Sequence, residues 1–160
     1  MLSLIHIFIA HIRENAAQYH VRPDAIAVCG FSAGGHLSAS SGILWNEPVI
    51  AETLGIENRM ARPDAMILSY PVITSGEHAH RGSFECLLGE RANDAAWLER
   101  LSLERRVDGT TPPTFLWHTF ADELVPVENA LLLASALRRA DVPFELHIFP
   151  EGIHGLSRCV

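Results

Sequence analysis

Ala25-Ile-Ala-Val-Cys-Gly-Phe-Ser-Ala-Gly34 is the stretch of sequence that decides the fold. Ala25–Cys29 has the composition of a buried strand, and Ala33–Ser41 has that of a helix. Between them Gly30, Ser32 and Gly34 make the pattern G-x-S-x-G, in which a serine lies on a sharp turn from strand to helix. Small residues must flank the serine because so tight a turn leaves no room for larger side chains. The stretch therefore predicts a strained turn that holds the Ser32 hydroxyl clear of the backbone.

Three further short runs have the composition of strands and lie far enough apart for helices to connect them. They are Ala65–Tyr70, Thr114–Thr119 and Phe144–Phe149. The first of these and Ala25–Cys29 are almost continuously apolar, which is typical of strands buried on both faces. Strands that alternate with helices form parallel sheets with right-handed crossovers. We therefore expect one α/β layer domain with a parallel sheet of about four strands and flanking helices.

Helices are predicted where apolar residues recur at intervals of three or four. Residues 92–106 and 127–137 follow this spacing, and Pro126 comes before the second helix, a position that proline favours. The first helix is predicted from the spacing of Phe8, Ile12, Ala16 and Tyr19. Residues 46–62 and 71–91 carry Pro, Gly and His and are expected to be irregular.

A catalytic serine needs two partners, because its hydroxyl is a weak nucleophile without a base and a carboxylate that orients the base. In an open parallel sheet, functional groups gather beyond the carboxyl ends of the strands. Asp122 follows the run that ends at Thr119, and His154 follows the run that ends at Phe149. We therefore predict Ser32, Asp122 and His154 as nucleophile, acid and base. Their order along the chain is the one expected of this architecture.

Neighbouring side chains offer alternatives for the acid. Asp122 could instead cap the helix that begins at Pro126. Glu123 is the competing carboxylate, since its longer side chain could also reach an imidazole.

The other histidines are interpreted as structural. His118 and His147 lie within predicted strands as hydrogen-bonded sheet residues, and His36 packs or bonds locally one turn past the serine. His78 and His80 either line a pocket or face solvent. The pair lacks further ligands for a metal ion, so we expect neither a metal nor a cofactor.

A resemblance to a known family rests on three segments. They are Cys29-Gly-Phe-Ser-Ala-Gly-Gly-His-Leu37, His118-Thr-Phe-Ala-Asp-Glu-Leu-Val-Pro126 and Phe149-Pro-Glu-Gly-Ile-His-Gly155. Together they resemble the α/β-hydrolase superfamily, and more narrowly the bacterial esterases related to acetyl-xylan esterases and acetylesterases. The resemblance extends from about residue 8 to the C-terminus. It implies a serine hydrolase that cleaves short-acyl esters, acetylated carbohydrates among them, through an acyl-enzyme.

The resemblance also implies a role for each site residue. Ser32 is the nucleophile, His154 is the general base and then the general acid, and Asp122 orients the imidazole. The backbone N–H of Ala33 is one donor to the oxyanion. The same three residues can cleave esters and amides, so a peptidase or amidase of the same fold is the alternative enzyme.

One feature of the family is missing from this sequence. In the family the serine turn follows the fifth strand, and a His-Gly-Gly-type loop after the third strand supplies a second oxyanion donor. Gly30 is the first glycine of this chain, and only about one helix precedes Ala25–Cys29. We therefore expect the C-terminal part of an α/β-hydrolase domain. In it Ala25–Cys29, the strand that precedes the serine turn, lies at an exposed edge of the sheet. Losing an oxyanion donor costs about 10²–10³ in kcat, so an inactive or partner-dependent fragment is the alternative outside the enzymes.

The N-terminus is apolar from Met1 to Ala10, which is too short for a membrane span of about 20 residues. It lacks the preceding basic residues and the small-x-small cleavage site of a signal peptide. Leu2-Ser-Leu-Ile-His-Ile7 resembles the translation of a transposon-based sequencing adapter. We interpret residues 1–7 as a non-native leader and residues 8–160 as a partial α/β-hydrolase domain.

Composition restricts the partners. The 160 residues carry 12 Lys and Arg against 19 Asp and Glu, a net charge of −7, and no basic run. This argues against nucleic acid or an anionic membrane as partner and favours a small-molecule ester. Cys29, Cys86 and Cys159 are odd in number and widely spaced, which predicts a reduced, cytoplasmic setting. Cys29 is expected in the core, and the sequence carries no signal for the oligomeric state.

Overall fold

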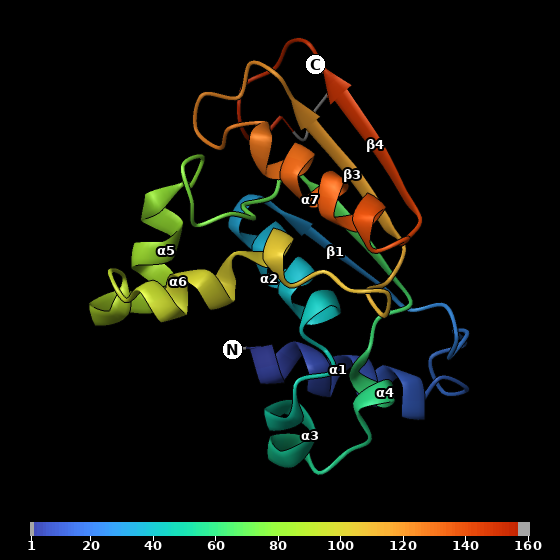
Figure 1. Cartoon of the computed structure of the whole chain (residues 1–160). Helices are drawn as coiled ribbons and strands as arrows, with labels where there is room; N and C mark the ends of the chain where they lie inside the picture. Colours follow the sequence, from blue (N-terminus) through green and yellow to red (C-terminus); the bar gives the residue numbers. More distant parts are fainter. Residues whose placement is uncertain (1, 157–160) are drawn as a thin grey trace.

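Four parallel strands form a sheet whose spatial order equals their order along the chain (Figure 1). The structure is a computed structural model and describes residues 2–156. The strands are β1 (Ala27–Phe31), β2 (Ala65–Ser69), β3 (Thr114–Thr119) and β4 (Phe144–Phe149). Each is parallel to its neighbour, so all four carboxyl ends lie at the same edge. The predicted parallel α/β sheet is confirmed. The first strand begins and ends two residues later than expected, so that Gly30 and Phe31 belong to it.

Helices connect and flank the strands. Three predicted helices are present as α1 (Leu2–Glu14), α2 (Ser32–Ile43) and α7 (Glu128–Arg139), although α1 ends before Ala16 and Tyr19. The helix expected over residues 92–106 is divided at Ser102 into α6 (Ala95–Leu101) and the 3₁₀ turn η2 (Leu103–Arg105). The irregular structure expected over 46–62 and 71–91 is confirmed for residues 71–80 and wrong for much of the rest, because short helices form there. They are α3 (Pro48–Leu54), α4 (Asn58–Ala61), α5 (Arg81–Leu88) and η1 (Gly89–Arg91).

The core lies between one face of the sheet and the helices α2 and α7, which Figure 1 shows in front of the strands. Met66 and Leu68 of β2 and Leu116 of β3 are fully buried against these helices. The helices contribute small and branched apolar side chains to the same cluster, among them Ala39, Ile43, Leu133 and Leu137. Burying a leucine or isoleucine side chain is worth about 1.5–3 kcal/mol and accounts for the helices' place on this face.

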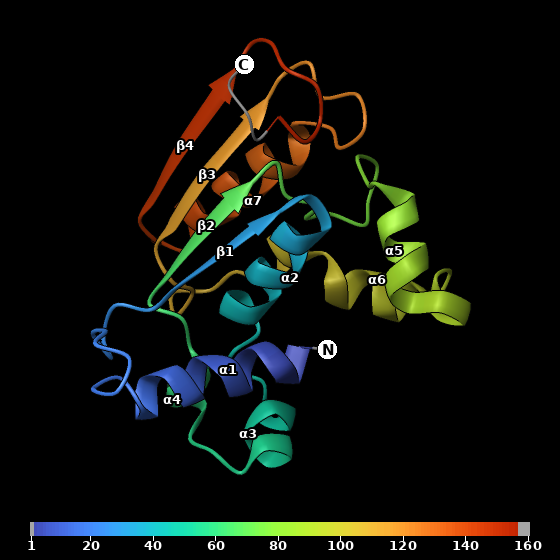
Figure 2. The same ribbon diagram turned by 180° about the vertical axis from the view of Figure 1, so that it is seen from behind.

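The opposite face of the sheet is largely open, and Figure 2 shows the strands in front of α7 from that side. Cys29 and Ile67, paired across β1 and β2, are both exposed there. The prediction that Cys29 lies in the core is therefore wrong, as is the expectation that the apolar strands are buried on both faces. The reason is that α2 and α7 cover a single face. β1 is the edge strand of the described sheet, as expected.

The N-terminal helix α1 packs beneath the sheet against α2, α3 and α4 (Figure 2). Its buried His6 shares a hydrogen bond with the carbonyl of Ser41 in α2, at 3.0 Å. Arg13 forms an ion pair with Asp64, at 3.1 Å, just before β2. The division into a leader at residues 1–7 and a partial domain at 8–160 stays a prediction. Within residues 2–156, no helix combines the length and apolar character that crossing a membrane requires.

Candidate active site

Ser32 lies at the junction of β1 and α2, at the carboxyl edge of the sheet. Its backbone has φ +54°, a left-handed conformation that is uncommon for a residue with a side chain. The turn is tight because α2 begins at once: Phe31 ends β1 and Ser32 is the first helical residue. Ala33 follows within the first turn of α2, where backbone N–H groups have no acceptor inside the helix. The local structure thus presents a hydroxyl beside the N–H groups of the first turn of α2.

The glycines around Ser32 are required to different degrees. A Cβ on Gly30 would lie 2.2 Å from the carbonyl oxygen of Gly34 and 2.4 Å from Ser38 Oγ, so a side chain there cannot fit. A Cβ on Gly34 would meet nothing within 4 Å. Crowding therefore explains Gly30 but not Gly34. Gly35, which the sequence pattern did not single out, needs its small size because a Cβ would lie 2.7 Å from the Pro71 side chain.

Asp122 lies in the loop between β3 and α7 and is buried, with 6% of its surface exposed. Its Oδ1 accepts hydrogen bonds from the backbone N–H groups of Leu124, at 3.0 Å, and Val125, at 2.9 Å. It does not cap α7, which begins at Glu128 after the N-cap residue Val127. The competing Glu123 is exposed. Of the two acids only Asp122 faces the serine, through His154.

His154 lies in the loop after β4 and connects the other two residues. Its Nδ1 is 2.7 Å from Asp122 Oδ2, and its Nε2 is 2.8 Å from Ser32 Oγ. Because an ionised carboxylate only accepts, Nδ1 carries the proton and Nε2 is free to accept from the serine hydroxyl. The structure thus brings together the three residues that the sequence predicted, from loops that follow β1, β3 and β4.

The electrostatics of Asp122 suit this arrangement. Burial alone would raise the pKa of the Asp122 carboxyl. The hydrogen bonds from His154, Val125 and Leu124 outweigh burial and hold its pKa below the ordinary value. The carboxylate therefore stays ionised at neutral pH and faces the imidazole as an anion.

Tyr70 is a site residue that the sequence reasoning missed. It follows β2 with φ +38°, a strained conformation for an aromatic residue. Its ring meets that of His154 edge to face, with 5.0 Å between centroids, and meets Trp117 in the same way at 5.0 Å. The ring is buried, with 5% exposure. Tyr70 therefore forms one wall against the His154 imidazole, and its only signal in the sequence was its place at the end of a strand.

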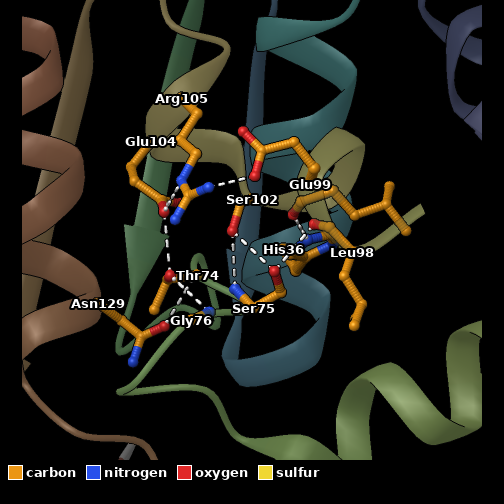
Figure 3. A network of polar contacts seen from close by, with 11 residues as sticks. His36, Thr74, Ser75, Gly76, Leu98, Glu99, Ser102, Glu104, Arg105 and Asn129 are labelled. Carbon is orange, nitrogen blue, oxygen red and sulfur yellow. Dashed lines mark hydrogen bonds and ion pairs between the residues drawn. The ribbon is translucent and has the colours of Figure 1, made fainter. Parts of the chain in front are cut away.

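The segment that follows Tyr70 is tied to both the serine turn and the helices. The N–H of Val72 donates to the carbonyl of Ser32, at 3.1 Å. Figure 3 shows the polar contacts beyond it: Thr74 donates to the buried Glu104, at 2.9 Å, and the Ser75 N–H donates to Ser102, at 2.9 Å. These contacts fix the segment against η2, beside the reactive serine.

A buried asparagine of α7 completes the network in Figure 3. Asn129 is fully buried, and its Oδ1 accepts from the N–H groups of Ile73, at 2.9 Å, and Thr74, at 3.1 Å. His36 of α2 contacts the carbonyl of Leu101, at the end of α6, through Nε2 at 3.0 Å, so its role is structural as expected but its partner is distant in sequence. Burial lowers the pKa of the His36 imidazole, so it is neutral.

The other histidines considered in the sequence analysis have different surroundings. His147 is exposed on β4 beside Glu145, at 2.6 Å, and His80 contacts Ser83, at 2.8 Å. The backbone carbonyl of His78 accepts from Asn129. His118 is different, because its Nε2 lies 3.3 Å from Asp122 Oδ2 as well as beside a backbone carbonyl. Among residues 2–156, no three His, Cys, Asp or Glu side chains gather as a metal site would require.

Comparison with known proteins agrees with the fold. The sequence profile of the BD-FAE family matches residues 4–137 of this chain. The chain belongs to the BD-FAE family of α/β hydrolases. The BD-FAE match includes β1, β2, β3 and most of α7 and ends before β4, so it contains Ser32 and Asp122 but not His154.

Relatives of this BD-FAE chain include named esterases. It is 42% identical over 151 residues to endo-1,4-beta-xylanase B of Butyrivibrio fibrisolvens, a match that covers 91% of this chain and 23% of the xylanase. It is 34% identical over 150 residues to an acetylxylan esterase of Xylanibacter ruminicola, covering 91% of this chain and 29% of that protein. Among solved structures, the acetyl ester-xyloside bifunctional hydrolase of Caldicellulosiruptor lactoaceticus is similar with a TM-score of 0.85 and 43% identity. That match covers 98% of this chain and 57% of the hydrolase. The chain thus spans less than two thirds of each of these relatives.

Proposed function

We propose that this chain carries the reactive centre of a carboxylic ester hydrolase, with Ser32 as nucleophile, His154 as base and Asp122 as orienting acid. The observation that carries the proposal is the continuous hydrogen-bonded line from Ser32 Oγ through both ring nitrogens of His154 to Asp122 Oδ2, at 2.8 and 2.7 Å. The same three roles recur in serine hydrolases of unrelated folds, where geometry rather than sequence position defines them.

Acylation follows from the positions of the protons. His154 Nε2 takes the proton of Ser32 as Oγ attacks the ester carbonyl, which gives a tetrahedral intermediate with a negatively charged oxygen. The imidazolium formed in this step lies against the ionised Asp122, which stabilises it. His154 then gives the proton to the leaving alcohol, and the acyl group remains on Ser32.

Deacylation repeats these transfers with water. His154 removes a proton from a water molecule, the hydroxide attacks the acyl carbonyl, and the proton returns to Ser32 as the acid leaves. The donor we propose for the oxyanion in both steps is the N–H of Ala33, which lies in the first turn of α2. The positive end of the α2 dipole favours the same charge.

The substrate class we propose is short-acyl esters, acetylated carbohydrates among them. The support for this class is the similarity to proteins named as an acetylxylan esterase and an acetyl ester-xyloside hydrolase. An acetyl group is small, and the scissile bond is an ester that the triad can cleave without a cofactor.

The test is hydrolysis of p-nitrophenyl acetate by the purified chain, together with labelling by a fluorophosphonate. We expect both reactions in the parent protein and neither in Ser32→Ala. The matched control is Ser135→Ala, because Ser135 is an exposed serine on α7 that contacts Arg139 and not the site. Peptide mapping should locate the phosphonyl group on Ser32.

The result that overturns the proposal is equal turnover and equal labelling in the parent and Ser32→Ala. Faster cleavage of a dipeptidyl anilide than of the acetate ester would reassign the chain to the amidases. Labelling without turnover would mean that the nucleophile is intact and the oxyanion is poorly stabilised, since the label needs only the activated serine.

A further inference from the structure

His118 is a second imidazole at the carboxylate of Asp122. It comes from β3, four residues before Asp122, and its side chain is fully buried. Its Nε2 lies 2.9 Å from the carbonyl oxygen of Val125 and 3.3 Å from Asp122 Oδ2. The same Oδ2 accepts from His154 Nδ1, at 2.7 Å. Two histidines therefore meet at one oxygen of the acid.

The surroundings of His118 fix its proton. Both atoms near Nε2 are acceptors, so Nε2 must carry the hydrogen. Nδ1 is buried without a hydrogen-bond partner in the described part of the chain, so a proton there would find no acceptor. Burial lowers the pKa of the His118 imidazole, against the opposing effects of Val125 and Asp122. The ring is therefore neutral, and its one N–H bonds to the Val125 carbonyl and lies beside the Asp122 carboxylate.

The contacts of Asp122 engage both of its oxygens. Oδ1 accepts from the N–H groups of Leu124 and Val125, and Oδ2 accepts from His154 Nδ1 and lies 3.3 Å from His118 Nε2. His118 also bonds to the carbonyl of Val125, so it holds both the carboxylate and the loop that bends back over it. With these contacts in place, the buried carboxylate cannot rotate without losing hydrogen bonds.

A neutral donor has an advantage over a charged one at this position. During ester cleavage His154 becomes an imidazolium, and a second cation at Asp122 would repel it and take part of the attraction of the carboxylate. A neutral imidazole holds the orientation of Asp122 without adding charge. The arrangement leaves His118 Nδ1 buried without a hydrogen-bond partner among residues 2–156, and a buried polar atom of this kind needs an explanation beyond packing.

We propose that His118 is a positioning residue that, as a neutral imidazole, holds the Asp122 carboxylate in the orientation that serves His154. The proposal rests on the proposed function for its catalytic consequence. Its structural content concerns the protonation of His118 and the hydrogen bond between Asp122 and His154, and both can be measured without turnover.

The first measurement uses the unmodified chain. The ¹⁵N ring signals of His118, identified by comparison with a His118 variant, report which nitrogen carries the proton. We expect Nε2 to be protonated and Nδ1 to be unprotonated near neutral pH. A proton on Nδ1, or on both nitrogens, overturns the proposal whether or not any variant folds.

The second measurement compares two substitutions. His118→Gln places an amide N–H the same number of bonds from the backbone as Nε2, whereas His118→Met fills similar space and donates nothing. We expect the low-field proton signal of the His154–Asp122 hydrogen bond to be lost in His118→Met and kept in His118→Gln. The kcat for p-nitrophenyl acetate should fall about 10- to 100-fold in His118→Met, the worth of a hydrogen bond to a charged group, with KM changed less than about threefold. His118→Gln should recover most of that loss.

His147 supplies the matched control, because it is an exposed histidine on the neighbouring strand β4 and contacts Glu145 instead of the site. His147→Met should leave the low-field signal and kcat unchanged. A His118→Met protein that folds and keeps both the signal and the parental kcat overturns the proposal, as does a His118→Gln protein as impaired as His118→Met. If the parent chain neither hydrolyses the ester nor reacts with the fluorophosphonate, the proposed function has failed, and the two proton measurements alone decide the role of His118.

Discussion

Replacing Gly30 and Gly34 separately with alanine should have opposite effects, although both glycines belong to the same short pattern. At Gly30 the new Cβ would lie 2.2 Å from the Gly34 carbonyl oxygen and 2.7 Å from the Gly34 carbonyl carbon, where ordinary contacts begin near 3.4 Å. Backbone atoms must therefore move by roughly 1 Å, at a cost at or above the 1–3 kcal/mol typical of overpacked sites. The Ser38 hydroxyl, at 2.4 Å, can rotate away and adds less.

At Gly34 the new Cβ meets nothing within 4 Å, and the residue lies inside α2. Removing a glycine from a helix lowers the entropy of the unfolded chain, which stabilises by about 0.4–1 kcal/mol. The two variants should therefore differ by about 1.4–4 kcal/mol or more in free energy of unfolding.

Urea denaturation followed by circular dichroism measures this difference, provided the slope with denaturant is the same in both proteins. The parent chain is the reference for both variants. The account of the turn would be refuted by a Gly30→Ala protein within about 1 kcal/mol of the parent, or by equal losses in the two variants.

Three further predictions concern the wall of the site, the core and pH. Tyr70→Phe keeps the ring against His154 and should retain kcat within about twofold, whereas Tyr70→Leu should lose about tenfold in ester hydrolysis; equal rates would show that the ring has no effect. Leu116→Ala should cost about 2.7–5 kcal/mol in urea, while the exposed Leu131→Ala should change stability by less than about 0.5 kcal/mol. The pKa values of His36 and His118 are lowered by burial, so the unfolded chain binds protons that the folded chain refuses. The free energy of unfolding should therefore fall as pH drops below about 6.5, by up to about 1.4 kcal/mol per pH unit for each histidine. A free energy of unfolding that rises as pH drops below about 6.5 would contradict the neutral state of both histidines.

The strands were predictable from sequence because their apolar, β-branched runs are short and bounded by turn residues. β3 and β4 have the predicted bounds, and β2 differs by one residue. The short helices α3, α4 and α5 were not predicted, because glycine, proline and histidine nearby mask helices of only four to eight residues that tertiary packing stabilises. The exposure of Cys29 was also missed, since an apolar run gives no information about which face of a strand the helices cover.

The residues of the candidate triad could be predicted because each directly follows a strand, and position after a strand is visible in sequence. The side chains that surround them could not. Tyr70 reaches His154 only because a left-handed backbone turns its ring toward the site, and His118 meets Asp122 only because the loop from Phe120 to Val125 folds back on β3. Such contacts depend on loop conformation, which residue type and spacing do not determine.

The triad joins both edges of the sheet, since Ser32 follows the edge strand β1 and His154 follows the edge strand β4, 122 residues later. The base can reach the nucleophile only after every strand has paired, including the long-range parallel pairings that form slowly. A fluorophosphonate pulse during refolding would then label only molecules whose sheet is complete. The labelling of Ser32 thus reports the time at which the sheet is completed during folding.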